Sequence, residues 1–193
     1  MRYSETHKSE THTKLLKLAS RALREKGPEG LAVSELMGAA GLTHGGFYAH
    51  FNSKDALLIE ALECIFEESR EKLREMTKGL PPREALRVYI EHYVSPAHRD
   101  KVGAGCPIVA LNSHLPRQSR RFRATFDAGV KSLVADLAGW IKAAGIADNE
   151  SLAAAIVAAM TGAVAVSRAI SDKRLSDELL TATRDSIKAR LNL

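Results

Sequence analysis

Cysteine and aromatic residues are both scarce in this chain. Of its 193 residues only Cys64 and Cys106 are cysteines, and Phe, Trp and Tyr together make up 5%. Two cysteines give no disulfide framework of the kind that staples small secreted domains, and nothing resembles a secretory signal. We therefore expect a cytoplasmic protein held by an apolar core, for which 45% hydrophobic residues are enough.

Long apolar runs and β-strand patterns are also missing. The longest nearly apolar stretch, Leu152 to Val166, is shorter than a membrane span and contains Thr161 and Gly162, so we interpret it as a buried helix. The alternation of apolar and polar residues that marks a half-buried strand occurs nowhere. The sequence therefore predicts an all-α fold that does not enter a membrane.

The residue spacings that catalysis or metal binding requires are absent too. An enzyme needs a nucleophile, a base and a stabilising group that converge, and we find no such set. Some residues of zinc-ligand type occur in the middle of the chain, but no pair has a tight ligand spacing: His92, His98, Cys106 and His114. We expect neither an enzyme nor a bound metal or cofactor.

The stretch from Ala32 to Phe51 is, by contrast, dense in local signals. Its first part has apolar residues at helical spacing, namely Val33, Leu36, Met37 and Ala40. Gly41 follows where the end of a helix favours a left-handed residue, which glycine adopts most easily. The sequence therefore predicts a short helix over residues 32–40 that ends in a tight turn.

A second helix is predicted directly after this turn. Thr43 is a good N-cap, whose hydroxyl would accept a hydrogen bond from a free N–H group. Phe47 and Phe51 share one face and should pack against Leu36 and Ala40. The other face should point outward with small and polar residues: His44, Gly45 and Tyr48. Two helices joined in this way form a helix-turn-helix, which places its second helix in the major groove of DNA.

The next residues carry a resemblance to a known family. Lys54 opens a third helix, where a lysine opposes the helix dipole unless a phosphate lies nearby. The run GLTHGGFYAHFNSKDAL, from Gly41 to Leu57, resembles the DNA-binding signature of the TetR/AcrR family of bacterial transcriptional regulators. The resemblance implies a helix-turn-helix head on a larger helical body.

The residues that would contact DNA follow from this resemblance. They are Ser34, Thr43, His44, Gly45, Gly46, Tyr48, His50 and Lys54, of which we expect Tyr48 and Lys54 to matter most. The chain departs from the family at Ala32, where a capping hydroxyl residue is usual, so we expect Ser34 to cap the helix instead. In the family, lysine is common at the position of His44 and threonine at that of Gly46. Because this chain has neither, base readout should rest on few side chains.

The chain divides into a basic head and a longer body. We predict a DNA-binding domain over residues 1–54, a helix that continues it to about residue 78, and a ligand-binding and dimerisation domain over residues 79–193. The head carries eight Lys and Arg against five Asp and Glu. We expect about nine helices, with a loose segment over residues 1–9 and Ser95-Pro96 closing a helix. The longer helices are predicted over residues 10–26, 55–78, 83–94, 118–144, 148–170 and 176–191.

A second basic excess lies in residues 91–131, which hold seven Lys and Arg against three Asp and Glu. Four of these residues crowd together: Arg117, Arg120, Arg121 and Arg123. We interpret this cluster as the solvated end of a helix. The net charge of +5 suits an acidic partner without identifying one.

The body should bind a ligand and a second copy of the chain. The resemblance implies that its last two helices form a four-helix bundle with those of the copy, and small residues would allow a close approach: Ala155, Ala158, Ala159, Gly162 and Ala163. Burial within one chain explains the same residues. An apolar ligand pocket is predicted between residues 83–94 and 118–144, where most aromatic residues of the body lie: Tyr89, Tyr93, Phe122, Phe126 and Trp140. Plain core packing explains these aromatics about as well.

Cys106 is a candidate thiol sensor. Pro107 suits the first position of a helix, which makes Cys106 its N-cap, and the helix dipole with Arg99 and Lys101 would favour a thiolate. The chain resembles a branch of the family in which a Gly-Cys pair opens this helix, and some members respond to electrophiles or oxidants through it. A small buried cysteine that only fills space is the alternative.

These observations predict a homodimeric transcriptional regulator, a repressor that binds a pseudo-palindromic double-stranded DNA operator. A small-molecule inducer, or an electrophile or oxidant, would release it. The alternative is an architectural DNA-binding protein without an inducer, and an apolar cavity in the body would distinguish the two.

Overall fold

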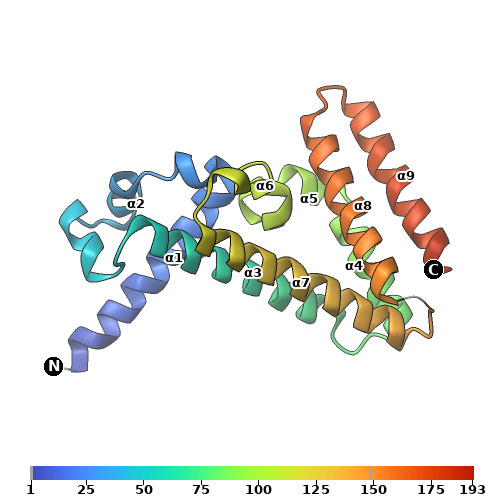
Figure 1. Ribbon diagram of the computed structural model, residues 1–193, viewed down its shortest axis with the longest axis horizontal. Helices are drawn as coiled ribbons and strands as arrows, with labels where there is room; N and C mark the ends of the chain where they lie inside the picture. Colours follow the sequence, from blue (N-terminus) through green and yellow to red (C-terminus); the bar gives the residue numbers. More distant parts are fainter. Residues whose placement is uncertain (1, 148) are drawn as a thin grey trace.

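The computed structural model describes residues 2–147 and 149–193, and all the regular structure in these ranges is helical (Figure 1). The absence of strands from the described ranges confirms the all-α prediction. In chain order the elements are α1 (Arg2–Gly30), α2 (Val33–Ala40), the 3₁₀ helix η1 (His44–Ala49), α3 (Lys54–Thr77), α4 (Pro82–Tyr93), α5 (Pro96–Asp100), η2 (Val102–Ala104), α6 (Pro107–Leu111), η3 (Leu115–Arg117), α7 (Arg120–Ala143), α8 (Asn149–Ala169) and α9 (Lys173–Leu191).

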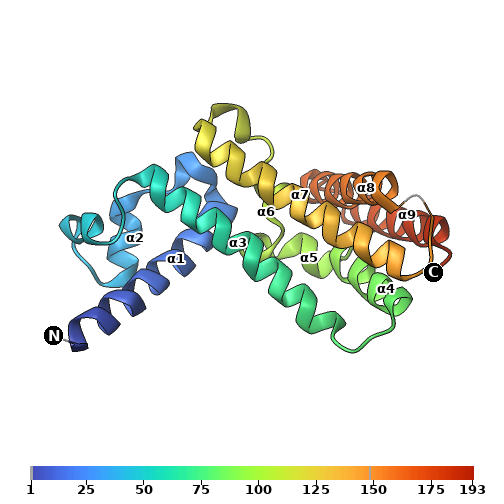
Figure 2. The ribbon, with the colours of Figure 1, turned by 60° about the horizontal axis from the view of Figure 1, so that its bottom comes forward.

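The molecule is elongated, with a head at the N-terminal end and a body at the other (Figure 1). The head comprises α1, α2, η1 and the first half of α3. The body comprises the rest of α3 and the helices from α4 to α9. Helices α3 and α7 run along the long axis and connect the two parts (Figure 2).

Two helices begin earlier than the periodicity predicted. The expectation of a loose segment over residues 1–9 is wrong, because α1 already begins at Arg2. Polar residues can extend a helix that is nucleated further along, since each residue added gains one backbone hydrogen bond. Helix α9 begins at Lys173 because the carboxylate of Asp172 accepts two hydrogen bonds from the backbone of its first turn.

The segment after α4 contains a short helix that periodicity could not reveal. Ser95 and Pro96 were expected to close a helix, and they also open α5. The Ser95 hydroxyl accepts a hydrogen bond from the backbone N–H of His98 at 3.2 Å. Pro96 occupies the first helical position, where its missing N–H needs no partner. The two residues therefore act as a helix start signal, although the helix is too short to show a period.

Gly27 and Pro28 interrupt α1 as predicted. Gly27 has φ 72° and ψ 175°, outside the helical region, and one further turn follows to Gly30. The imidazole of His114 lies directly against this break, and its Nδ1 is 2.7 Å from a carboxylate oxygen of Glu29. The kink in the head is thus fixed by a side chain from the segment between α6 and α7.

One apolar core holds the head together. Its largest buried residues include Leu15, Leu23, Met37, Phe47, Phe51, Leu57, Leu62 and Ile65. Burial of a side chain of this size stabilises the folded state by about 1.5–3 kcal/mol. Leu111 of α6 and Phe122 and Phe126 of α7 belong to the same core. The start of α7 is therefore part of the head, although it follows the body helices in sequence.

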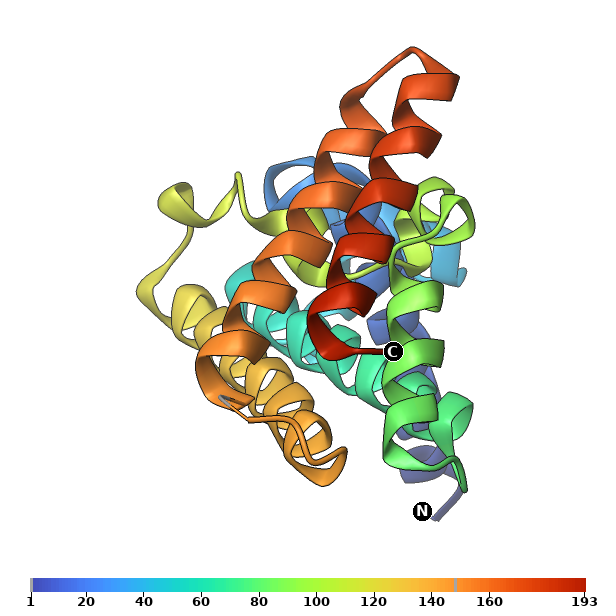
Figure 3. The ribbon, with the colours of Figure 1, turned by 90° about the vertical axis from the view of Figure 1, so that its right-hand side faces the viewer.

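A second core holds the body. It is formed by Leu73 of α3, by α4 and by the facing sides of α7, α8 and α9, with Cys106 and Val109 at its edge. Helices α8 and α9 form an antiparallel pair on the outside of the body (Figure 3). The short α8–α9 connection is held by its own polar network.

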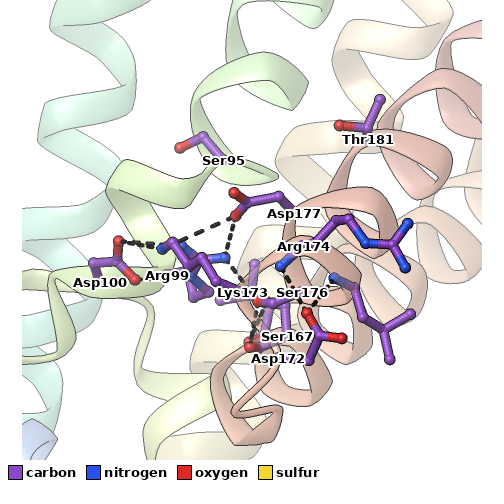
Figure 4. A network of polar contacts seen from close by, with 12 residues as sticks. Ser95, Arg99, Asp100, Ser167, Asp172, Lys173, Arg174, Ser176, Asp177 and Thr181 are labelled. Atoms are coloured by element: carbon purple, nitrogen blue, oxygen red, sulfur yellow. Dashed lines mark hydrogen bonds and ion pairs between the residues drawn. The ribbon is translucent and has the colours of Figure 1, made fainter.

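This network centres on Arg99, whose side chain is almost wholly buried (Figure 4). Its guanidinium donates to the Ser176 hydroxyl at 2.7 Å and to the carboxylates of Asp100 and Asp177. The Ser176 hydroxyl in turn donates to the backbone carbonyl of Ser167 in α8 at 2.6 Å. Because a buried charge requires partners, Arg99 fixes α5 to the first turn of α9 and the last turn of α8.

Helix α8 leaves a strip of small and apolar residues uncovered. By length and composition Glu150–Ala169 could cross a membrane, with a mean hydropathy of 1.7 over an 18-residue window of which 44% is buried inside the protein. Ala158 and Gly162 are exposed and Val166 is 49% exposed. Ala163 was predicted on this face, but it packs in the body core and is only 6% exposed.

Gly27 provides a test of how the head is anchored. A Cβ atom there would lie 2.4 Å from Cε1 of His114, whereas one at Gly79, which has a similar φ of 74°, would meet nothing within 4 Å. Alanine in the left-handed region costs about 1–2 kcal/mol at either position. We expect Gly27→Ala to lower the free energy of unfolding clearly more than Gly79→Ala, as measured by urea denaturation. Equal losses would mean that the His114 contact does not constrain the kink.

Candidate nucleic-acid interface and ligand cavity

Helix α2 is the first element of the helix-turn-helix. Its N-cap is Ala32, whose carbonyl accepts the N–H of Leu36 at 3.1 Å without any side-chain cap. The prediction that Ser34 caps this helix is wrong: Ser34 lies inside the first turn and is exposed. Gly41 ends the helix at φ 78°, as predicted, and its N–H bonds to the carbonyl of Gly38 at 3.0 Å.

The second element, η1, is tighter than the α-helix that was predicted. The N–H of Gly46 bonds to the carbonyl of Thr43 at 3.0 Å, which is the i to i+3 pattern of a 3₁₀ helix. Because this backbone bond already satisfies the first turn, the Thr43 hydroxyl makes no capping bond, contrary to expectation. Gly45 and Gly46 have poor α-helix propensity, which favours the short 3₁₀ form. We call η1 the recognition segment.

The inner face of the recognition segment is firmly anchored. Phe47, and Phe51 two residues after the segment, are each only 2% exposed, with ring centroids 5.6 Å apart, in the core that also holds Leu36 and Ala40. This arrangement confirms the predicted packing. The opposite face is free, because so short an element packs against the head core on one side only.

The outer face carries the residues that were predicted to point outward. Tyr48 is 68% exposed, and its ring packs edge-on against Phe47 with centroids 5.3 Å apart. Thr43, His44 and Gly45 are exposed as well, and a Cβ atom on Gly45 would meet nothing within 4 Å. An aromatic side chain anchored at its base, beside a stretch of bare backbone, can approach base edges and phosphates closely.

His50 is placed differently from the other predicted contacts. Its ring is partly buried among His12 and Phe51, and its Nδ1 is buried without a hydrogen-bond partner among the described residues. Burial, together with the neighbouring His12 and Lys8 side chains, lowers the pKa of His50. The imidazole therefore presents only part of its edge to the outside.

The start of α3 completes the surface. The Ser53 hydroxyl accepts the backbone N–H of Ala56 at 3.0 Å, so Lys54 occupies the first helical position, as predicted. Lys14 of α1, which the sequence did not single out, donates from Nζ to the carbonyl of Ala40 at 2.9 Å and closes the end of α2. A polar side chain on an amphipathic helix carries no local signal that it will cap a distant helix.

The body contains an apolar cavity of about 80 Å³ between α3, α4, α7 and the segment before α6. Its walls include Phe66, Leu73, Met76, Tyr89, Tyr93, Cys106 and Leu133. Tyr89 and Tyr93 line the cavity as predicted. Phe122 and Phe126 were also predicted to line it, but they belong to the head core. Trp140 lies behind Tyr89, edge-on at 5.8 Å. The prediction placed the pocket between the correct helices but missed the wall that α3 contributes.

Three residues form a polar corner of this cavity. The backbone N–H of Cys106 donates to Nε2 of His98 at 3.1 Å, and Nδ1–H of His98 donates to the carbonyl of Tyr93 at 2.7 Å. Burial lowers the pKa of His98 to about 4, so the ring is neutral and holds both segments together. The Tyr93 hydroxyl is buried beside the Cys106 thiol and has no hydrogen bond of ordinary geometry.

Cys106 is the N-cap of α6, as predicted, but its surroundings do not favour a thiolate. The residue is 9% exposed, and burial raises the pKa of its thiol despite the Tyr93 hydroxyl, nearby backbone N–H groups and Arg168. Arg99 was expected to supply positive charge here but is engaged by Asp100 and Asp177. Burial also raises the pKa of the Cys64 thiol.

Of the residues of zinc-ligand type, His92, His98 and Cys106 lie around the cavity and His114 lies in the head. Within the described ranges, no group of three or more His, Cys, Asp or Glu is placed to hold a metal ion. The ring of His92 stacks on that of His98 at 6.3 Å, and His114 pairs with Glu29 in the head. Each of these histidines thus has a structural contact of its own.

Comparison with known proteins agrees with this architecture. Residues 15–61 match the family model described as bacterial regulatory proteins of the tetR family, and residues 82–182 match that of the LmrA/YxaF-like transcriptional regulator C-terminal domain. The first match covers the helix-turn-helix and the start of α3. The second covers the body from α4 into α9.

Individual relatives match over shorter parts. The transcriptional regulator YerO of Bacillus subtilis is 32% identical over 85 residues, or 42% of this chain and 29% of YerO. CymR of Pseudomonas putida is 36% identical over 75 residues, or 39% of this chain and 37% of CymR. The repressor NemR of Escherichia coli is 24% identical over 128 residues, or 65% of this chain and 64% of NemR. The chain thus spans less than two thirds of each of these relatives.

Solved structures share the fold over nearly the whole length. The reduced form of E. coli NemR superposes with a TM-score of 0.81 at 22% identity, covering 93% of this chain and 96% of NemR. A TetR-family regulator from Cytophaga hutchinsonii gives 0.81 at 21% identity, covering 95% and 96%. Because the C-terminal family model alone spans more than half of the sequence and the N-terminal model covers the helix-turn-helix, this chain belongs to the TetR family of bacterial transcriptional regulators.

Proposed function

We propose that the protein is a homodimeric repressor that binds a pseudo-palindromic operator and is released from it by a small molecule. The observation that carries this proposal is the recognition segment: its inner face is locked into the head core by Phe47 and Phe51, and its outer face exposes Tyr48 beside bare glycine backbone. A rigid, solvent-facing element of this kind suits entry into the major groove. The protein would act on chromosomal DNA in the cytoplasm.

The uncovered faces of α8 and α9 support a dimer. Val166 of α8 and Leu175 of α9 are 49% and 48% exposed, and Ala158 and Gly162 continue the strip on α8. Exposed apolar strips of this kind mark interaction sites, and a two-fold pairing would cover the same strip on both copies. Two heads related by this symmetry would read two half-sites.

The cavity supports a small-molecule signal rather than an architectural protein without an inducer. Its walls are mainly apolar, with Arg70, Lys72 and His92 also around it, and the Tyr93 hydroxyl, which has no hydrogen bond of ordinary geometry, is available to a ligand. A volume of about 80 Å³ favours a compact, largely apolar molecule. Binding would bias the equilibrium between a DNA-competent and an incompetent placement of the heads.

A second candidate signal is an electrophile or oxidant that modifies Cys106. The observation that favours it is the place of this thiol on the cavity wall at the start of α6. The raised pKa of the thiol opposes it, because the thiolate is the reactive form.

Operator binding should depend on the outer face of the head. We expect Tyr48→Ala and Lys54→Ala each to weaken binding to a duplex selected from a random pool by the wild-type protein. Lys54→Ala should also reduce the salt dependence of log K by about one unit for each phosphate that Lys54 neutralises. Lys78→Ala, at the exposed far end of α3, is the control and should change neither. An unchanged salt dependence would make Lys54 an ordinary surface residue.

The dimer should depend on the exposed strip of α8. We expect Val166→Glu to convert the protein to monomers in light scattering, because it would bury an unpaired carboxylate between the copies. Leu80→Glu, in the exposed loop between α3 and α4, should leave the mass unchanged. A dimeric Val166→Glu protein would exclude this face as the interface.

Alkylation distinguishes the two signals. If a non-covalent ligand is the signal, N-ethylmaleimide should react with the buried Cys106 no faster than with the partly exposed Cys64 at neutral pH, and Cys106→Ser should respond to the ligand as the wild type does. If Cys106 is a sensor, it should react at least about tenfold faster than Cys64, and its modification should release DNA. The rates are read by mass spectrometry of the two cysteine peptides, and DNA release by fluorescence anisotropy.

A further inference from the structure

The start of α7 carries a dense group of exposed positive charge that the recognition segment does not explain. We call Arg117, Arg120, Arg121 and Arg123 the arginine patch, and all four are exposed. Arg117 is 3.6 Å from a carboxylate oxygen of Glu29. Within the part of the chain that the structure describes, no ion pair is formed by Arg120, Arg121 or Arg123.

The arginine patch is carried by the head, not by the body. The Ser119 hydroxyl donates to a carboxylate oxygen of Asp55 at 2.9 Å, and Phe122 is completely buried in the head core. The amide nitrogen of Gln118 donates to Glu29 at 2.7 Å. The start of α7 is thus bonded to the first turn of α3 through Asp55 and to the end of α1 through Glu29.

The arginine patch lies next to Lys54, which the proposed function assigns to DNA binding. Asp55, which receives the Ser119 hydroxyl, directly follows Lys54, so the arginine patch extends the positive surface away from the recognition segment. Of the two neighbouring carboxylates, Glu29 lies 3.6 Å from Arg117 and also contacts His114 and Gln118, and Asp55 accepts the Ser119 hydroxyl. Four arginines lie beside these two carboxylates, so the patch keeps an excess of positive charge.

The arginines are also unfavourably placed for the helix itself. Arg120, Arg121 and Arg123 lie in the first turn of α7, which contains no acidic residue, so they oppose the helix dipole. Arg120 and Arg123, three positions apart, repel each other. An anion bound outside the helix would relieve both effects, and arginine forks match the geometry of phosphate oxygens.

We propose that the arginine patch binds the phosphate backbone of the operator outside the bases that the recognition segment reads. This inference rests on the proposed DNA binding and lengthens its footprint. It assigns the patch a sequence-independent share of the affinity, which is salt-dependent because each neutralised phosphate releases counterions. An acidic protein partner is the competing occupant, and the experiment separates the two.

The test compares two duplexes with the same selected core, one of them extended by about 10 base pairs, one helical turn, on each side. The wild-type protein should bind the long duplex several-fold more tightly than the short one. The triple variant Arg120→Gln, Arg121→Gln, Arg123→Gln should not show this advantage and should bind the short duplex as the wild type does. On the long duplex its salt dependence of log K should fall by about 0.9 for each phosphate that is no longer neutralised.

Two control proteins isolate the effect of charge at this place. Lys142→Gln removes an exposed charge from the other end of α7 and should behave as the wild type. A triple Arg→Lys variant keeps the charge and should retain most of the salt dependence. Unfolding midpoints close to that of the wild type would establish that the variants are folded.

The outcomes distinguish failure of this inference from failure of the proposed function. If the triple Gln variant equals the wild type on the long duplex, the arginine patch does not bind DNA and the inference is overturned. If it is equally weakened on both duplexes, the patch does not bind the flanks and the inference is also overturned. If the wild-type protein selects no duplex at all, the proposed function itself fails. This outcome is observed with the wild type alone and does not depend on any variant.

Discussion

The apolar face of α3 is the constraint on which both halves of the molecule depend, because it is buried in two cores in succession. Leu57, Leu62 and Ile65 fill the head core, and Leu73, about two turns further on, belongs to the body core. A single rigid helix therefore sets the placement of the head on the body. The start of α7 reinforces this link from the other direction, since Phe122 and Phe126 join the head while the rest of the helix packs in the body.

The cavity lies where these two cores meet, which gives the proposed regulation a short physical route. Phe66 forms part of the cavity wall and also packs edge-on against Phe126 in the head core, with ring centroids 6.0 Å apart. Gly129 allows this approach, because a Cβ atom there would lie 2.3 Å from the Phe66 ring. A molecule that displaces Phe66 would disturb the head core directly, so coupling between ligand and DNA needs no long chain of residues.

Polar contacts add a second set of connections around the same cavity. His98 joins the end of α4 to Cys106, and the next residue, Arg99, joins α5 to the α8–α9 pair. Arg24 of α1 donates to the carbonyl of Gly103 in η2 at 2.7 Å. The segment from α5 to η2 thus contacts the cavity, the proposed dimer helices and the head. The cavity corner and the head are therefore connected both through apolar packing and through hydrogen bonds.

The sequence by itself determined what depends on neighbouring residues. Helical period and end signals placed most long helices, the turn at Gly41 and the anchoring of Phe47 and Phe51, because these follow from backbone geometry within a few residues. The tertiary structure alone decided which side chains meet across the chain. It assigned Phe122 and Phe126 to the head rather than the cavity, brought Phe66 of α3 into the cavity wall, and buried Cys106 where its thiol pKa rises. Periodicity shows that a helix has a buried face, but the neighbour that covers each turn of that face depends on how the helices cross, which no local pattern encodes.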